Sequence, residues 1–174
     1  MKFKQVVSFF QLDIQHLDKD ETLVVLDIDE TILYYDTITN TWWEDTFNDF
    51  YKQTRDYDVA DTLTTQLWKT TIDHNKPHHT DKNGLQYLLR NYNCVFITAR
   101  TPDLMDHTRY EFDVLGIPYN NVYYSGDRNK SDVLLPLLTD NIKHVVFVDD
   151  RVYNCTDVKD ALTNVTTHIF QFCM

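Results

Sequence analysis

Glycine is scarce in this chain: 3 Gly occur among 174 residues, where average usage of about 7% gives roughly a dozen. Few turns therefore depend on glycine. Cysteine is equally sparse, and Cys94, Cys155 and Cys173 are odd in number, far apart and without metal-type pairing. They indicate reduced thiols of an intracellular protein, so we expect a cytoplasmic location.

Long apolar runs are also missing. No stretch approaches the roughly 18 apolar residues of a membrane span, so we expect no membrane association. The N-terminal segment MKFKQVVSFFQLDI contains an apolar patch, but Gln11 and Asp13 interrupt it and no small-residue cleavage site follows. This pattern argues against a signal peptide.

Basic residues are few: the chain has 16 Lys and Arg, 27 Asp and Glu, and a net charge of -11. Nucleic-acid backbones are bound by clustered Lys and Arg, so this balance argues against a nucleic-acid partner. It does not exclude a small phosphorylated ligand at one local site. The length and the apolar fraction of 43% predict a single globular domain spanning residues 1–174.

Four short apolar runs predict buried strands. They are continuously apolar rather than alternating, which is typical of a parallel sheet covered on both faces. A fifth run, closer to an edge strand, is expected near the C-terminus. The four runs are residues 22–28, 94–99, 121–125 and 144–150, and the fifth is 165–172.

Helical patterns lie between the strands, and this alternation predicts an α/β doubly wound fold. One helix is expected to begin with Thr101 as its N-cap and Pro102 at its first position, and to end at Gly116. Pro136 predicts that a later helix starts late or bends. The predicted helices cover residues 81–91, 101–116, 131–138 and 154–162.

The segment from about 41 to 80 is too long for a single crossover, and it contains two helical patterns, 42–54 and 57–72. We expect a small helical insertion above the carboxyl ends of the strands, where ligands bind in such sheets. The core then comprises about 18–40 and 81–174. Trp42 and Trp43 are candidates for a lid or for an inward-packing anchor.

Each strong strand ends in, or leads into, polar residues. In a parallel sheet these ends meet at one crevice, which would hold a carboxylate cluster, a hydroxyl group and a lysine. The residues are Asp27 and Asp29 after the first run, Thr98 after the second, Lys130 after the third, and Asp149 and Asp150 after the fourth.

This combination indicates phosphoryl transfer. Carboxylates that repel one another are stabilised by a hard cation such as Mg²⁺, which binds oxygen ligands. An aspartate can act as nucleophile and form an aspartyl-phosphate. A second carboxylate can exchange protons with the leaving group and water, while lysine and hydroxyl groups orient the phosphoryl oxygens.

The motifs DIDET, ITAR, RNKSD and VDDR, in this order and at plausible spacing, resemble those of the haloacid dehalogenase (HAD) superfamily of phosphatases. The resemblance covers nearly the whole chain and implies a three-layer Rossmann-like fold with a small helical cap. Within the superfamily, the chain is similar to acid-phosphatase-like members and to a bacterial branch whose members begin with a short helical lead like residues 5–17.

The resemblance also implies the role of each site residue. Asp27 would be the nucleophile and Asp29 the general acid and base. Thr98 and Lys130 would bind the phosphoryl group. The Mg²⁺ ligands would be the carboxylates of Asp27 and Asp149, the backbone carbonyl of Asp29, and Asp150 either as a ligand or as an orienting acceptor.

The expected function is hydrolysis of a small soluble phosphomonoester. Two alternatives stay open: a nucleotidase or polynucleotide 3′-phosphatase, and a catalytically silent HAD-like binding module. Arg100 and Arg151 are equally explained by ion pairs or substrate contacts. The cluster of His74, His78 and His79 is better explained by a polar loop around Pro77 than by a transition-metal site.

Overall fold

The computed structural model describes residues 2–39 and 41–174. The chain divides into two compact units: Met1–Leu33 together with His79–Met174, and Tyr34–His78. The larger unit is built on a parallel sheet and the smaller one on two helices. All residues predicted for the site belong to the larger unit.

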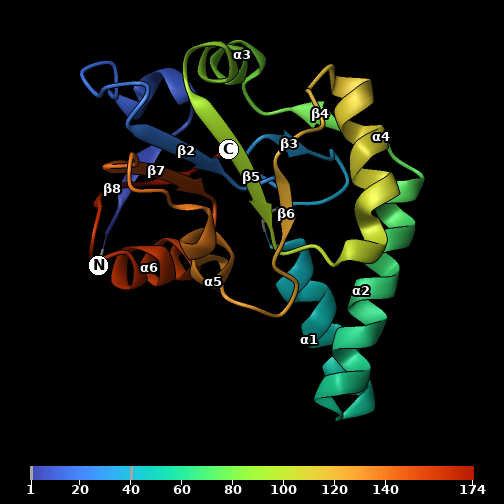
Figure 1. Ribbon diagram of the computed structural model, residues 1–174. Coiled ribbons are helices and arrows are strands. Elements are labelled where there is room, and N and C mark those ends of the chain that lie inside the picture. The colour runs from blue at the N-terminus through green and yellow to red at the C-terminus, as the bar shows by residue number, and fades with distance from the viewer. Residues whose placement is uncertain (1, 40) are drawn as a thin grey trace. The chain divides into compact units, whose positions relative to one another are not determined.

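The larger unit contains a six-stranded sheet with the strand order β1-β8-β7-β2-β5-β6 (Figure 1). Each pair of neighbouring strands runs parallel. The predicted α/β class with a parallel sheet is therefore confirmed. The strands are β1 (Lys4–Val6), β2 (Thr22–Leu26), β5 (Asn93–Thr98), β6 (Val122–Tyr124), β7 (His144–Asp149) and β8 (Thr166–Phe172).

Helices cover both faces of this sheet and create three layers (Figure 1). On one face, Val25 of β2 belongs to a buried cluster with Leu134 and Val158. On the other face, the rings of Phe96 and Phe112 meet edge to face, with their centroids 5.1 Å apart. Successive strand residues point to opposite faces, and burial on both explains the continuous apolar runs. The helices are α3 (Lys82–Asn91), α4 (Met105–Leu115), α5 (Lys130–Leu134) and α6 (Val152–Ala161).

The N-terminal segment differs from its prediction. Residues Lys4–Val6 form β1, which pairs with β8, and a 3-10 helix follows at Phe9–Leu12. The expected helical lead over residues 5–17 is therefore wrong. The expected edge position of β8 is also wrong, because β8 lies between β1 and β7. β1 has three residues, of which two are exposed, so no apolar run marks it in the sequence.

The start of α4 differs from its prediction, whereas its end agrees. Thr101 and Pro102 begin a 3-10 turn, Pro102–Leu104, and α4 starts only at Met105. The predicted end is confirmed: Gly116 adopts a left-handed conformation with φ 67°, and its N–H donates to the carbonyl of Phe112. Glycine enters this region without the steric cost that a Cβ brings.

The late start predicted from Pro136 is wrong, and the α-helix instead ends before the proline. Helix α5 begins at Lys130, one residue before the predicted start, and a 3-10 turn with Pro136 in its first positions follows at Leu135–Leu137. The proline ring cannot continue regular i→i−4 hydrogen bonding. The early start places Lys130 at the beginning of a helix rather than in a loop.

The smaller unit contains the two predicted helices, α1 (Trp42–Thr54) and α2 (Tyr57–Asp73). Asp56 caps α2 by accepting a hydrogen bond from the N–H of Val59. Aromatic rings join the helices, with Trp43 and Trp68 centroids 6.4 Å apart. A short two-stranded sheet, β3 (Leu33–Tyr34) and β4 (His78–His79), forms where the chain enters and leaves this segment.

None of the helices within the described residues is both long enough and apolar enough to cross a bilayer.

Candidate phosphoryl-transfer site

Three neighbouring strands deliver the predicted site residues to one edge of the sheet. Strand β2 lies between β7 and β5. Asp27 follows β2 directly, Asp149 is the last residue of β7, and Thr98 is the last residue of β5. Because the strands are parallel, their carboxyl ends lie at the same edge, as the sequence predicted.

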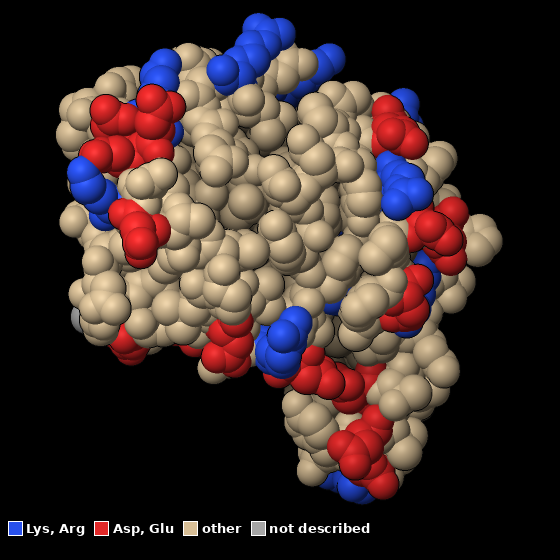
Figure 2. Space-filling model, viewed as in Figure 1, with Lys and Arg blue, Asp and Glu red and all other residues tan. Residues whose placement is uncertain are grey.

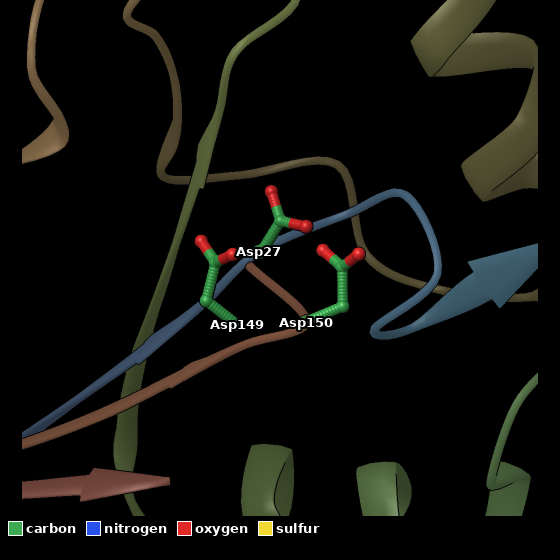
Figure 3. A group of neighbouring side chains, drawn as sticks. All are labelled: Asp27, Asp149 and Asp150. Atoms are coloured by element: carbon green, nitrogen blue, oxygen red, sulfur yellow. The ribbon is translucent and has the colours of Figure 1, made fainter. Parts of the chain in front are cut away.

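Asp27, Asp149 and Asp150 form the carboxylate cluster at this edge. One carboxylate oxygen from each lies within 4.8 Å of those of the other two. Figure 3 shows the three carboxyl groups gathered at the strand ends and directed to the same side. Asp149 is fully buried, and Asp27 is 6% exposed. Such close burial of like charges is costly unless cations compensate it.

Lys130 supplies one of these cations. Its ammonium group donates to Asp27 Oδ1 and, at 2.7 Å, to Asp149 Oδ2. Burial by itself lowers the pKa of Lys130, but Asp149 and Asp27 raise it well above its usual value. The lysine is therefore a permanent positive charge that joins two members of the cluster.

Backbone and side-chain donors orient the two buried aspartates. Asn154 Nδ2 donates to both carboxylate oxygens of Asp149 at 3.1 Å, and the N–H of Arg151 donates to Oδ1 at 2.8 Å. Thr31 Oγ1 donates to Asp27 Oδ2 at 3.3 Å. These partners leave Asp27 with fewer hydrogen bonds than Asp149.

Asp150 shares its surroundings with Arg151 and Glu30. Arg151 Nε lies 2.9 Å from Asp150 Oδ2, and its Nη2 lies 3.5 Å from Glu30 Oε2. Burial raises the pKa of Asp150 to about 9, and the charges of Asp27 and Asp149 add to the effect. Burial also raises the pKa of Asp27 to about 7, although Lys130 opposes the shift.

The charge balance at this edge fits a divalent cation. Four carboxyl groups (Asp27, Asp149, Asp150 and Glu30) are paired with two cations, Lys130 and Arg151, so two negative charges are unbalanced when all four groups are ionised, as metal binding requires. Two oxygens on opposite sides of Mg²⁺ are about 4 Å apart, close to the spacing of up to 4.8 Å in the cluster. The residues present therefore fit a hard, oxygen-binding ion.

Asp29 points to a different partner. Arg100 binds its carboxylate through two parallel hydrogen bonds, from Nε to Oδ2 at 2.9 Å and from Nη2 to Oδ1 at 2.7 Å. The Asp29 side chain is 35% exposed, whereas that of Arg100 is 1% exposed. The carboxylate of Asp29 thus lies beside the cluster, held by a buried guanidinium and still accessible to solvent.

The sequence did not reveal what holds Arg100. Its guanidinium also donates to Thr108 Oγ1 at 2.9 Å and to both oxygens of Glu111, which is fully buried. Thr108 and Glu111 are three residues apart on α4, beside Phe112 on its buried face. The sequence does place Glu111 on the apolar side of the predicted helix. A buried carboxylate requires a partner, so this position could have indicated a buried ion pair.

Thr98 is fully buried. Its Oγ1 accepts from the N–H of Arg100 at 3.1 Å, and its carbonyl accepts from the N–H of Ser125 at 2.8 Å. These bonds tie the end of β5 to the segment before Lys130. The hydroxyl proton of Thr98 remains available as a donor.

The three histidines around Pro77 bind three different partners. His74 Nδ1 lies 2.8 Å from the Thr70 carbonyl, His78 Nε2 lies 3.3 Å from Asp36 Oδ2, and His79 Nε2 lies 2.8 Å from the Leu115 carbonyl. The rings do not converge on one point. The prediction of a loop is wrong in part, because His78 and His79 form β4.

No protein-family model, curated protein or solved structure matches the chain, so the description of this site depends on the geometry of its own residues.

Proposed function

We propose that the chain is a Mg²⁺-dependent phosphomonoester hydrolase of the haloacid dehalogenase type, acting on a small soluble substrate. The observation that carries this proposal is the carboxylate cluster beside the buried ammonium of Lys130. A parallel α/β sheet with its polar residues at the carboxyl ends of the strands supports it. The order of the four sequence motifs supports it independently.

In the proposed reaction, Asp27 attacks the phosphorus atom with a carboxylate oxygen. The bond from phosphorus to the ester oxygen breaks, and Asp29 gives a proton to the departing alcohol. Water then transfers a proton to Asp29 and attacks the phosphorus of the aspartyl-phosphate. The acyl phosphate bond breaks, which releases inorganic phosphate and restores the carboxylate of Asp27.

Lys130 and Thr98 orient the phosphoryl oxygens in this proposal. Lys130 is preorganised, because its ammonium is held by two carboxylates in a buried position, and fixed charges stabilise a developing charge without reorganisation. The carboxylates of Asp27, Asp149 and Asp150 would hold Mg²⁺, together with the backbone carbonyl of Asp29. When bound, the ion neutralises phosphoryl charge and draws the phosphoryl group toward Asp27.

Asp29 can serve as proton donor despite its partner. A carboxylate offers about four lone-pair positions, and the two hydrogen bonds from Arg100 use one position on each oxygen. With 35% of its side chain exposed, Asp29 remains open to a substrate. Arg100 is thus a positioning residue, which fixes the direction of the carboxylate without occupying it fully.

The alternative functions differ from the proposed one in the surface charge that they require or in the activity that they predict. A polynucleotide phosphatase requires a basic track, and on the face drawn in Figure 2 the Lys and Arg side chains form no continuous band. A silent binding module would bind phosphate without turnover. A nucleotidase shares the proposed chemistry with a narrower substrate range.

The test is phosphate release from a panel of phosphomonoesters, measured with Mg²⁺ and with excess chelator. We expect turnover that requires Mg²⁺ and that Asp27→Asn abolishes while the protein stays folded, because an amide does not attack phosphorus as a carboxylate does. Asp113→Asn is the matched control, since Asp113 is exposed on α4. Full activity in chelator, or substantial hydrolysis by folded Asp27→Asn protein, would refute the proposal.

A further inference from the structure

An open hollow of about 450 Å³ lies in the larger unit. It is lined by the segment between β6 and α5, by residues of α6 from Tyr153 to Asp160, and by Ala99. Its volume falls within the range of roughly 300–1,000 Å³ that is usual for small-molecule pockets. None of the predicted site residues lines it, so the proposed chemistry leaves it without a role.

The walls of the hollow continue directly into the candidate site. Ala99 follows Thr98, and Asn129 precedes Lys130. Asn154, another lining residue, donates to both carboxylate oxygens of Asp149. The hollow and the carboxylate cluster are therefore built on neighbouring residues of the same strand and helix ends.

The lining has a definite chemical character. Tyr153 presents an aromatic ring that is 68% exposed. Three carboxylates, Asp127, Asp157 and Asp160, are accompanied by one cation, Arg128, which leaves two negative charges. Carboxylates accept hydrogen bonds from hydroxyl groups, whereas further phosphate groups would be repelled.

We propose that this hollow binds the alcohol portion of the substrate, and that it selects phosphomonoesters whose alcohol is uncharged and carries a ring and hydroxyl groups. This inference rests on the proposed function. The ring would stack on Tyr153, and the hydroxyl groups would donate to Asp127 and Asp160. A second phosphate on the same molecule would meet the excess negative charge and would bind less well.

Binding of unreactive analogues tests the inference without turnover. The ligands are methylene phosphonate analogues of a hexose phosphate and of a nucleoside 5′-phosphate, with inorganic phosphate as the probe for the phosphoryl site alone. Calorimetry with Mg²⁺ should show that Tyr153→Ala weakens at least one phosphonate by about fivefold or more, the lower end of what aromatic stacking contributes. Inorganic phosphate should change by less than about twofold.

Tyr110→Ala is the matched control, because Tyr110 is 59% exposed on α4 and does not line the hollow. Tyr110→Ala should leave the affinities for both phosphonates and for inorganic phosphate unchanged. Preferential binding of the nucleoside analogue would indicate base stacking, and preferential binding of the hexose analogue would indicate hydroxyl recognition. If neither phosphonate binds more tightly than inorganic phosphate, or if Tyr153→Ala weakens all three equally, the inference is wrong.

The charge of the hollow is tested separately. The double variant Asp127→Asn with Asp160→Asn should narrow the preference for a monophosphonate over the corresponding bisphosphonate by about threefold or more, because two repelling charges are removed. An unchanged preference would contradict the selection. Failure of these binding tests with Mg²⁺-dependent phosphate release intact would overturn this inference alone, whereas absence of phosphate release from every ester would overturn the proposed function.

Discussion

Binding of Mg²⁺ to the carboxylate cluster should release protons, and the structure sets how many. Without a cation, the pKa of Asp27 is raised to about 7 and that of Asp150 to about 9, in both cases chiefly by burial. Both carboxyl groups must be ionised to bind the metal. Each Mg²⁺ bound should therefore release about one to two protons at pH 7, and fewer as the pH rises through about 9.

The same linkage determines how affinity and stability depend on pH. Between pH 7 and pH 8 the affinity for Mg²⁺ should rise by roughly tenfold to thirtyfold, because the slope equals the number of protons released. Both folded-state pKa values lie above the ordinary value of 3.8, so these groups stabilise the metal-free protein at low pH. This stabilising contribution is full below about pH 4 and is lost progressively as the pH rises, up to about 7 for Asp27 and about 9 for Asp150.

Isothermal titration calorimetry in buffers with different ionisation enthalpies measures the released protons directly. Asp150→Asn removes the group with the higher pKa, so the release of protons at pH 8 should fall well below that of the wild type, and the affinity for Mg²⁺ should weaken. Asp113→Asn should leave both quantities unchanged. A binding heat that is independent of the buffer at pH 7, in wild-type protein that binds Mg²⁺, would refute the assignment of the metal to these carboxylates.

Three further predictions concern other parts of the chain. Arg100→Ala removes the guanidinium that pairs with buried Glu111, while His107 Nε2 stays 3.2 Å from Glu111 Oε1. Urea denaturation should therefore show a free energy of unfolding lower by about 3 kcal/mol, the lower end of the range for a broken buried ion pair, whereas exposed Arg90→Ala should change it by less than about 0.5 kcal/mol. Replacing Trp42 and Trp43 together by alanine should impair hydrolysis of larger substrates more than that of a small phosphoester if they form a lid, whereas equal losses would indicate an anchor. Catalytic efficiency on a small phosphomonoester should vary little from low to physiological salt, and a salt-sensitive preference for a 3′-phosphorylated oligonucleotide would contradict the assignment of substrate class.

Where sequence and structure agree, the physical cause is burial on both sides of the sheet. Strands β2, β5 and β7 were predictable because both faces of each are covered, which produces unbroken apolar runs. The polar residues that end these runs lie at the carboxyl edge because parallel strands share a direction. The placement of Asp27 and Asp149 follows from these two facts.

Strand β1 and the Arg100 network were not predictable, for different reasons. β1 is short and lies at the sheet edge with two exposed residues, so its position depends on pairing with β8 rather than on an apolar pattern. The sequence left Arg100 open between ion pairing and substrate contact. Its choice of Asp29 and Glu111 depends on side chains from α4 and the segment after β2 meeting in three dimensions.

The sequence by itself determined the parallel α/β class, the main strands and the edge at which the carboxylates gather, because the pattern of apolar and polar residues is a local property of the chain. The tertiary structure alone decided that Asp27, Asp149 and Asp150 surround one point, that Lys130 joins two of them, and that Asp29 turns to Arg100. These contacts join residues distant in the chain. Their geometry follows from strand register and helix packing, which no single segment specifies.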